Sequence, residues 1–186
     1  AQAGSSRPRD LEQTRKSHEL VDLFIERAAD YRAAIRRVEA GILSYGSDIV
    51  LDNNAFSDYR FLNPYEAGLE WTVDLGRDGE FIGKAALGRI AERGAGHRVV
   101  GVEIGGDPIV GYLEDYLPVV DHSVQIGQVS SAFWSPRLER NIGFALVPVS
   151  HAEVGTKLTV RSAKGDAQAV VVPTPFVDPG KQTPKG

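Results

Sequence analysis

The stretch IGQVSSAFWSPRLERNIGFALVPV, residues 126–149, holds two runs of β-type residues separated by a polar segment that contains a proline. Apolar, β-branched and aromatic residues are typical of strands, and the polar segment is typical of a turn. Similar runs follow one another from His97 onward, with Gly, Pro, Asp and Asn between them. This spacing predicts a small antiparallel barrel or sandwich. The six runs are RVVGVEI, LPVVD, IGQVSSAFW, IGFALVPV, KLTVRS and AQAVVVPTPF.

Upstream of these runs the apolar residues recur at helical spacing. This periodicity predicts one helix over residues 16–31 and a second over residues 33–43, with Gly46 stopping it. A third helix is predicted over residues 81–93, ended by Gly94. These helices place the first half of the chain in a different structural class from the second half.

One further segment before the runs, GLEWTVDL at residues 68–75, alternates like a strand. The chain therefore divides near residue 95 into an α/β part, residues 1–95, and an all-β part, residues 96–186. The fold class predicted from this division is α+β, an α/β body followed by a C-terminal antiparallel β-barrel.

Composition excludes several classes of protein. A net charge of -4 and a pI near 5.6 argue against nucleic acid as a partner, because a nucleic-acid binder needs a basic face. No apolar run approaches the roughly 20 residues that cross a bilayer, so no membrane partner is expected. The absence of cysteine excludes disulfides and thiolate metal sites, and it fits a reducing, cytoplasmic compartment. Small molecules and proteins are the expected partners.

Methionine is also absent, which is unusual for 186 residues. We expect from this that an N-terminal portion is missing and that modified methionines were omitted from the sequence.

Several motifs, in order along the chain, resemble the aminomethyltransferase family, which contains the T-protein of the glycine cleavage system and related tetrahydrofolate-dependent demethylases. The resemblance runs from about residue 16 to the end and corresponds to the C-terminal half of such a protein. The matching motifs are RVEAGILSYGSDI (37–49), NPYEAGLEWTVDL (63–75), FIGKAAL (81–87), SPRLERNIGFALVP (135–148), GTKLTV (155–160) and VPTPFVDP (172–179).

The resemblance implies a folate-binding α/β body followed by a β-barrel, with tetrahydrofolate as the cofactor. It implies a one-carbon transferase, either an aminomethyltransferase or a methyltransferase, whose partner is a small-molecule donor or a lipoyl carrier protein. The family's catalytic aspartate is not expected in this chain, so no catalytic residue is assigned. The family's glutamate strand is poorly matched by AGSSRPRDLEQT, residues 3–14, and that glutamate is not transferred.

Three alternatives stay open within this resemblance. The donor can be dimethylsulfoniopropionate or an aromatic methyl ether, as in the demethylase branches. The chain can instead be the C-terminal folate domain of a sarcosine or dimethylglycine dehydrogenase. A folate-binding iron–sulfur assembly factor is the alternative that is not an enzyme, although that branch carries a Lys-Gly-Cys motif and this chain has no cysteine.

The resemblance assigns cofactor binding to Arg37, Tyr45, Trp71 and Arg98. A planar guanidinium at Arg37 can donate paired hydrogen bonds to a pterin carbonyl or a carboxylate, although pairing with Glu39 or another nearby carboxylate is the ordinary alternative. Tyr45 lies beside a glycine that allows close approach of a ligand, but a core tyrosine fits the pattern equally well.

Trp71 offers a face for stacking on the pterin or aminobenzoate ring, with a buried structural tryptophan as the alternative. We expect the helix end at 37–46 and the strand around Trp71 to form opposite walls of one slot for a flat, polar heterocycle. Arg98, at the start of the first β-type run, could meet the carboxylates of the folate tail or be solvated. Asp48 is interpreted as a turn residue rather than a base. The four histidines lack metal-ligand spacing, so no metal site is predicted.

Overall fold

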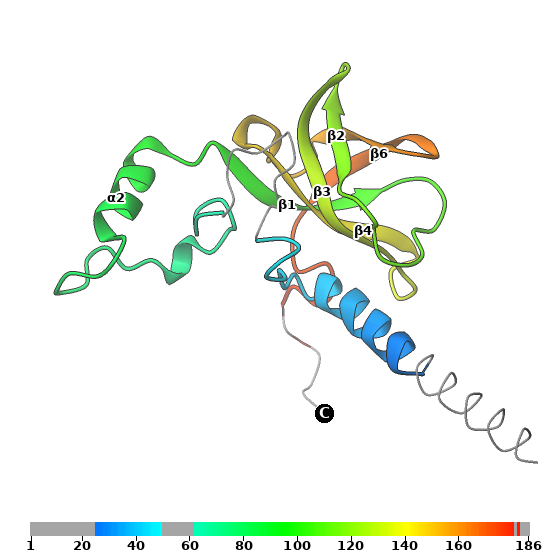
Figure 1. Ribbon diagram of the computed structural model, residues 1–186, viewed down its shortest axis with the longest axis horizontal. Helices are drawn as coiled ribbons and strands as arrows, with labels where there is room; N and C mark the ends of the chain where they lie inside the picture. The colour runs from blue at the N-terminus through cyan, green and yellow to red at the C-terminus, as the bar shows by residue number, and fades with distance from the viewer. Residues whose placement is uncertain (1–24, 50–61, 181, 183–186) are drawn as a thin grey trace, which may run out of the picture.

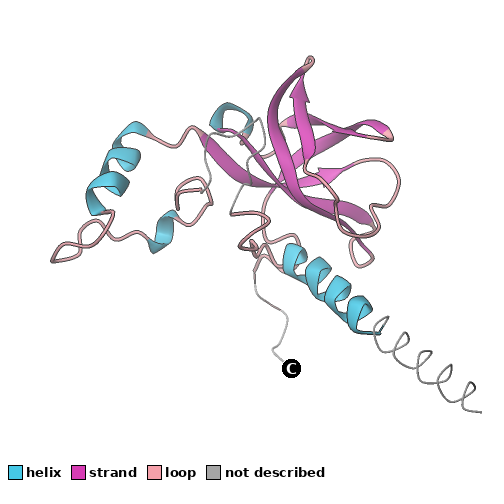
Figure 2. Cartoon of the chain, viewed as in Figure 1, coloured by secondary structure: helices cyan, strands magenta, loops and turns pink. Residues whose placement is uncertain are grey.

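The C-terminal half of the chain is a closed six-stranded antiparallel barrel (Figures 1 and 2). The computed structural model describes residues 25–49, 62–180 and 182. Around the barrel the strands follow the order β1-β4-β3-β2-β5-β6. The predicted α+β class with a C-terminal antiparallel barrel is confirmed. The strands are β1 (His97–Ile104), β2 (Leu117–Asp121), β3 (Val124–Ser135), β4 (Arg140–Pro148), β5 (Lys157–Ser162) and β6 (Gly165–Val172), with the 3-10 turn η2 (Val149–His151) after β4.

The barrel interior is filled by small aliphatic side chains. Successive residues of a strand point to opposite faces, so every second residue of each strand enters the core. In β1 these are Val100, Val102 and Ile104, and in β4 they are Ala145 and Val147, all of them buried in one cluster. The alternation visible in the sequence is therefore the alternation between the inside and the outside of the barrel.

Two glycines let neighbouring strands approach closely. A Cβ atom at Gly143 would lie 2.3 Å from the backbone oxygen of Ser131, and one at Gly127 would lie 2.3 Å from the backbone oxygen of Leu146. No side chain tolerates a contact that short with a backbone atom. Glycine is required at these two points for sheet closure.

One helix, residues 25–39, packs against the outside of the barrel. Ile35 and Val38 are buried in a cluster with the outward-facing Phe133, Ile142 and Phe144. The break predicted near residue 32, between two helices, was wrong, because one helix runs through residues 25–39. Neither glycine nor proline interrupts the chain there, so the helix continues. The predicted helical residues 16–24 lie outside the described residues.

Residues 62–69 pack against the barrel, where Leu62 and Ala67 are buried in one cluster with Leu146, and the segment between residue 70 and β1 forms an arm that stands away from the barrel (Figure 1). It holds the 3-10 turn η1 (Glu70–Thr72) and the helix α2 (Lys84–Arg93), and neither contains a buried residue. The predicted helix is confirmed, with its start moved to Lys84 because Gly83 adopts a left-handed φ of 93° as the N-cap. Within the part of the chain that the structure describes, no helix has the length and hydropathy that a membrane-spanning segment needs.

The strand predicted over residues 68–75 was wrong. Gly68 has a left-handed φ of 71°, and the backbone oxygen of Leu69 then accepts a hydrogen bond from the N–H of Thr72 at 2.9 Å. This turn closes locally before any neighbouring strand can pair with the segment. The alternation of polar and apolar residues in this segment therefore does not correspond to a strand of a sheet.

Candidate functional site

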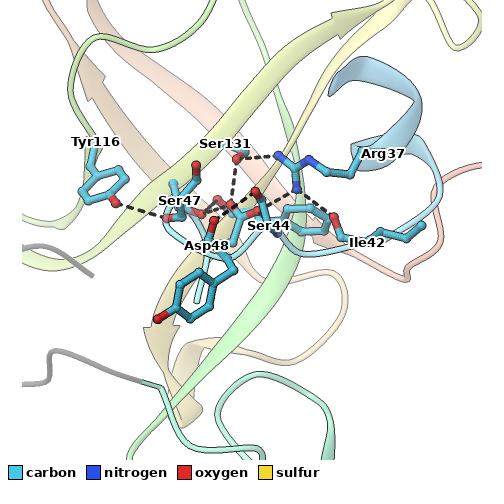
Figure 3. Close-up of polar contacts among 10 residues, drawn as sticks. Arg37, Ile42, Ser44, Ser47, Asp48, Tyr116 and Ser131 are labelled. Carbon is cyan, nitrogen blue, oxygen red and sulfur yellow. Dashed lines mark hydrogen bonds and ion pairs between the residues drawn. The ribbon is translucent and has the colours of Figure 1, made fainter. Parts of the chain in front are cut away.

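The C-terminal end of helix 25–39 holds the guanidinium of Arg37 in place. The chain leaves the helix through Gly41, whose φ is 73°, and turns back so that the carbonyl of Ile42 lies beside Arg37. Arg37 Nη1 donates to this carbonyl at 2.7 Å (Figure 3). A cation near the last carbonyls of a helix is favourable because it faces the negative end of the helix dipole. The guanidinium also lies 6.0 Å from the ring centre of Phe144.

A buried carboxylate, that of Asp48, faces Arg37 from the following turn. Asp48 is 1% exposed, and its Oδ2 atom accepts hydrogen bonds from Arg37 Nη1 at 2.7 Å and from the backbone N–H of Ser44 at 2.8 Å. The local hydrogen bond expected of a turn residue is present, because Asp48 accepts from the backbone N–H of Ser44, four residues before it. The carboxylate does more than close the turn, however, because it also forms the ion pair with Arg37.

The other oxygen of the Asp48 carboxylate is bound by the barrel. Oδ1 accepts from the hydroxyl groups of Ser130 at 2.6 Å and Ser131 at 2.7 Å, two consecutive residues of β3. Consecutive side chains of a regular strand point to opposite faces, but the β3–β4 pairing shifts register between Val129 and Ser131. Such a bulge re-aims a side chain, which lets both serines reach one carboxylate.

Arg37 lines a pocket of about 920 Å³ between the helix, the 44–47 turn, the β1–β2 loop and β3. Aromatic side chains form one side of it, from Tyr112, Tyr116 and Phe133. Tyr112 and Phe133 meet edge to face at 5.6 Å, and Tyr31 packs against both. The Tyr116 hydroxyl donates to the Ser47 carbonyl at 3.1 Å, which ties the loop to the turn (Figure 3).

The pocket carries more negative than positive charge. Asp30, Glu114 and Asp115 line it together with Arg37, whose own charge is balanced by Asp48. Its lining therefore offers carboxylate acceptors and aromatic faces. Among the described residues no group of three or more His, Asp or Glu side chains could hold a metal ion.

Part of the Arg37 guanidinium stays available to a ligand. An arginine has five N–H donors. Within the described chain three hydrogen bonds are formed, to Ile42, Asp48 and Ser131, the last from Nη2 to the Ser131 hydroxyl at 3.1 Å. The side chain is 22% exposed and lines the pocket. This arrangement can present directed donors to a carbonyl or an anionic group in the pocket.

Of the four residues predicted to bind the cofactor, the structure places only Arg37 in this pocket. Its ordinary alternative was pairing with Glu39 or another nearby carboxylate. Arg37 does pair with the nearby carboxylate of Asp48, whereas Glu39 accepts a hydrogen bond from the Ser135 hydroxyl at 2.5 Å. Tyr45 is 76% exposed and does not line the pocket, although its neighbours Ser44 and Gly46 do. Its role in ligand binding stays a prediction.

Trp71 lies in the arm, and Arg98 lies at the start of β1, where the arm ends. Trp71 belongs to η1, is 80% exposed and does not line the pocket that Arg37 lines. Arg98, near the start of β1, pairs with Glu70 of η1. The structure therefore does not bring Arg37 and Trp71 together as two walls of one slot. The ligand contacts assigned to Trp71 and Arg98 stay predictions.

Sequence reasoning missed three residues that hold the site together, namely Asp48 in this role, Ser130 and Ser131. The two serines lie 82 and 83 positions from Asp48 along the chain, so no local pattern connects them. One signal was present, because two adjacent serines interrupt the apolar alternation of IGQVSSAFW. A polar pair at that point of a barrel strand indicates a bulge or a buried polar partner.

The barrel matches a known domain family. Residues 97–178 match the family model described as the glycine cleavage T-protein C-terminal barrel domain. This region of the chain therefore matches that domain, and the resemblance to the aminomethyltransferase family seen in the sequence is confirmed.

Particular relatives extend the match beyond the barrel. An aminomethyltransferase from Synechococcus sp. (strain CC9902) is 41% identical over 141 residues, which cover 75% of this chain and 35% of that protein. An aminomethyltransferase from Symbiobacterium thermophilum is 40% identical over 142 residues, covering 75% of this chain and 34% of that protein. The chain thus spans about a third of the length of the curated relatives it matches.

A solved structure shares the fold. The crystal structure of the glycine cleavage system aminomethyltransferase T from Bartonella henselae aligns with a TM-score of 0.65 and 23% sequence identity. The alignment covers 78% of this chain and 38% of that chain. At this identity the likeness concerns the fold alone.

Proposed function

We propose that this chain forms part of a tetrahydrofolate-dependent one-carbon transferase of the aminomethyltransferase type, and that Arg37 and its pocket contribute to folate binding. The support is the family of the barrel together with curated relatives, named aminomethyltransferases, at 40 to 41% identity. The observation that carries the proposal is the guanidinium of Arg37, held by three protein partners at the edge of a pocket of about 920 Å³.

The pocket fits the heterocyclic end of tetrahydrofolate. Its volume lies within the range of about 300–1,000 Å³ that is common for ligand pockets. A reduced pterin carries a carbonyl oxygen beside N–H and amino donors, which match the free donors of Arg37 and the carboxylates of Glu114 and Asp115. Tyr112 and Phe133 offer aromatic faces for the flat ring. The anionic glutamate tail does not suit this acidic lining, so it would extend away from the pocket.

The contribution of these residues is binding and orientation. Tetrahydrofolate supplies the nitrogen that accepts the one-carbon unit. Holding two reacting groups in alignment turns a bimolecular encounter into an intramolecular one, which lowers a barrier by about 7–11 kcal/mol when alignment is good. The side chains described above would fix the ring and exclude water from its face. No catalytic acid or base is assigned among them.

Tyr45, Trp71 and Arg98 are proposed contacts only for parts of the cofactor or donor that extend beyond the pocket. The donor is proposed to be a lipoyl-bound aminomethyl group on a carrier protein, and a methylated small molecule is the alternative. The boundary between a folate-binding part and the barrel is proposed near residue 95, two residues before β1 begins at His97.

The first experiment tests the reaction. Full-length protein is incubated with tetrahydrofolate and, in separate arms, an aminomethyl-lipoyl carrier protein, dimethylsulfoniopropionate, an aromatic methyl ether, sarcosine or dimethylglycine. Mass spectrometry then identifies the folate product. We expect 5,10-methylene-tetrahydrofolate with the carrier protein, and 5-methyl-tetrahydrofolate in another arm would support the demethylase alternative. No folate product in any arm would contradict the proposal.

The second experiment tests the pocket. Calorimetric titration of full-length protein with tetrahydrofolate should show Arg37→Ala weakening binding about tenfold or more, since a charge-assisted bond is lost, equivalent to about 1.4 kcal/mol. Arg36→Ala is the matched control, because the neighbouring Arg36 is exposed and does not line the pocket. Equal affinities for the two variants would remove Arg37 from the binding site.

A further inference from the structure

The Asp48 carboxylate has no free position for a ligand. Its two oxygens accept four hydrogen bonds, from Arg37, the Ser44 N–H, and the hydroxyls of Ser130 and Ser131. An ionised carboxylate is only an acceptor, and these four donors fill it. The side chain is fully buried, which excludes direct contact with a substrate. Any effect of Asp48 on the site must therefore act through the groups that donate hydrogen bonds to its carboxylate.

We propose that Asp48 is a positioning residue that fixes the guanidinium of Arg37 toward the pocket and couples the folate site to the bulge of β3. This inference rests on the proposed function for its effect on folate. A long arginine side chain loses rotamer freedom when it is fixed, which costs free energy. The ion pair with Asp48, the Ile42 carbonyl and the Ser131 hydroxyl fix Arg37 before a ligand arrives. Binding then does not have to order it.

Ser131 connects the Asp48 carboxylate to a second nitrogen of the Arg37 guanidinium. Its hydroxyl donates its one hydrogen to Asp48 Oδ1 at 2.7 Å and accepts from Arg37 Nη2 at 3.1 Å. The guanidinium is thereby held at two of its nitrogens, since Nη1 bonds Asp48 and Nη2 bonds the serine. Two fixed nitrogens define the plane of the group, and the plane decides which way the remaining N–H donors point.

A second buried carboxylate provides the matched control. Glu39, in the last turn of the same helix, is bound by Ser135 of the same strand, β3, at 2.5 Å. It joins helix to barrel as Asp48 joins turn to barrel, but it makes no bond to Arg37. If the role of Asp48 were only to hold the structure together, then substitutions at Asp48 and Glu39 would have the same effect on the site.

The substitution Asp48→Asn keeps the shape of the side chain and removes its charge. The amide oxygen can still face Arg37 and the Ser44 N–H, and the amide N–H₂ can face the two serine hydroxyls, which rotate to accept. The variant is therefore expected to fold. It should loosen Arg37, because the ion pair is replaced by a hydrogen bond to a neutral amide oxygen and the Coulomb attraction between the two charges is lost.

The test has two measurements on full-length wild-type, Asp48→Asn and Glu39→Gln proteins. The first is the rate at which phenylglyoxal modifies Arg37, followed by peptide mass spectrometry, with the exposed Arg36 as the internal reference. We expect Asp48→Asn to raise the Arg37 rate relative to Arg36, and Glu39→Gln to leave this ratio unchanged. An unchanged ratio in Asp48→Asn, or equal changes in both variants, would overturn the inference.

The second measurement is the dissociation constant for tetrahydrofolate. We expect Asp48→Asn to raise it about fivefold or more and to have no further effect in an Arg37→Ala background, as for residues that act through one contact. Glu39→Gln should change it less than about twofold. Additive effects of Asp48→Asn and Arg37→Ala would overturn the inference. If the wild-type protein does not bind tetrahydrofolate, the proposed function fails, and the modification rates alone decide whether Asp48 positions Arg37.

Discussion

Two regions of the molecule are built on opposite faces of the same strands. One is the inside of the barrel, and the other is the joint between helix 25–39 and the outside of the barrel. The interior cluster contains only aliphatic residues. The joint combines an apolar cluster, around Ile35, Val38 and Phe144, with buried polar side chains that include Asp48 and Ser131. Inward-facing residues of β3 and β4 therefore specify the fold, whereas residues near the bulge on their outer side specify the site. Changes to the two sets should separate stability from ligand binding.

The largest effect is expected from Gly127→Ala in the barrel. The new Cβ would meet the Leu146 backbone oxygen at 2.3 Å, and two paired strands cannot separate without breaking the sheet. We expect a loss of more than about 3 kcal/mol in the free energy of unfolding, beyond the usual range for overpacking. Urea denaturation followed by circular dichroism measures it. A loss below about 1 kcal/mol would mean that the barrel yields at this point and does not dominate stability.

A smaller loss is expected from Ile35→Ala in the joint. Ile35 is buried against Phe133, Ile142 and Phe144, and its truncation leaves a cavity between helix and barrel. Such truncations cost roughly 2–5 kcal/mol, and we expect about 2 to 3 kcal/mol here because the helix can shift toward the barrel. Hydrogen exchange should show faster exchange of helix 25–39 with β1 and β6 unchanged. Equal acceleration in β6 would contradict a separation between joint and interior.

A gain is expected from Gly88→Ala in α2, which belongs to neither region. Gly88 has ordinary helical backbone angles and nothing lies within 4 Å of the added Cβ. Alanine in place of glycine in such a helix typically adds about 0.4–1 kcal/mol of helix stability. Slower amide exchange confined to residues 84–93 measures it. Altered exchange in the barrel strands would show that the arm is coupled to the barrel.

The smallest effect is expected at the β5–β6 hairpin. A hydrogen bond from Arg161 and the charge of its guanidinium lower the pKa of Asp166, and the same bond raises the pKa of Arg161. A carboxyl group whose pKa is lowered on folding stabilises the protein above its unfolded pKa, and this contribution is lost as the pH falls through the folded value. Both side chains are about half exposed, so the contribution to stability should be slight.

Nuclear magnetic resonance titration of Asp166 should therefore give a midpoint below the ordinary range for aspartate. Arg161→Gln should return the midpoint toward that range without moving the midpoint of urea unfolding at neutral pH. A large loss of stability in Arg161→Gln would show that the β5–β6 hairpin contributes substantially to the stability of the barrel, which was expected to come from the interior alone.

The sequence allowed the barrel to be predicted because its strands are defined locally. Runs such as RVVGVEI and KLTVRS alternate between inside and outside, and each ends at a turn residue. The strand order was not predictable, since β1 pairs with β4 and β6, far along the chain. Alternation also misled at residues 68–75, where Gly68 turns the chain before a partner strand is available.

For the site, the local part was predictable and the distant part was not. Arg37 and the turn at Asp48 were visible because both lie within one motif of 13 residues. The bond from Asp48 to Ser131 depends on how the turn after the helix is placed against β3, and that placement depends on apolar packing of Ile35 and Val38. Trp71 was assigned to the same slot through a strand that does not form. The error shows that a family motif fixes residue identity more reliably than it fixes mutual position.

If Arg37, held by Asp48, binds tetrahydrofolate in the pocket beside β3, a crystal structure of the full-length protein with tetrahydrofolate bound should show the contact. We expect the pterin in this pocket, with one of its polar atoms within about 3.2 Å of an Arg37 nitrogen while the bond to Asp48 is kept. A pterin bound elsewhere, with Arg37 still turned to Asp48 and no ligand atom in reach, would contradict it.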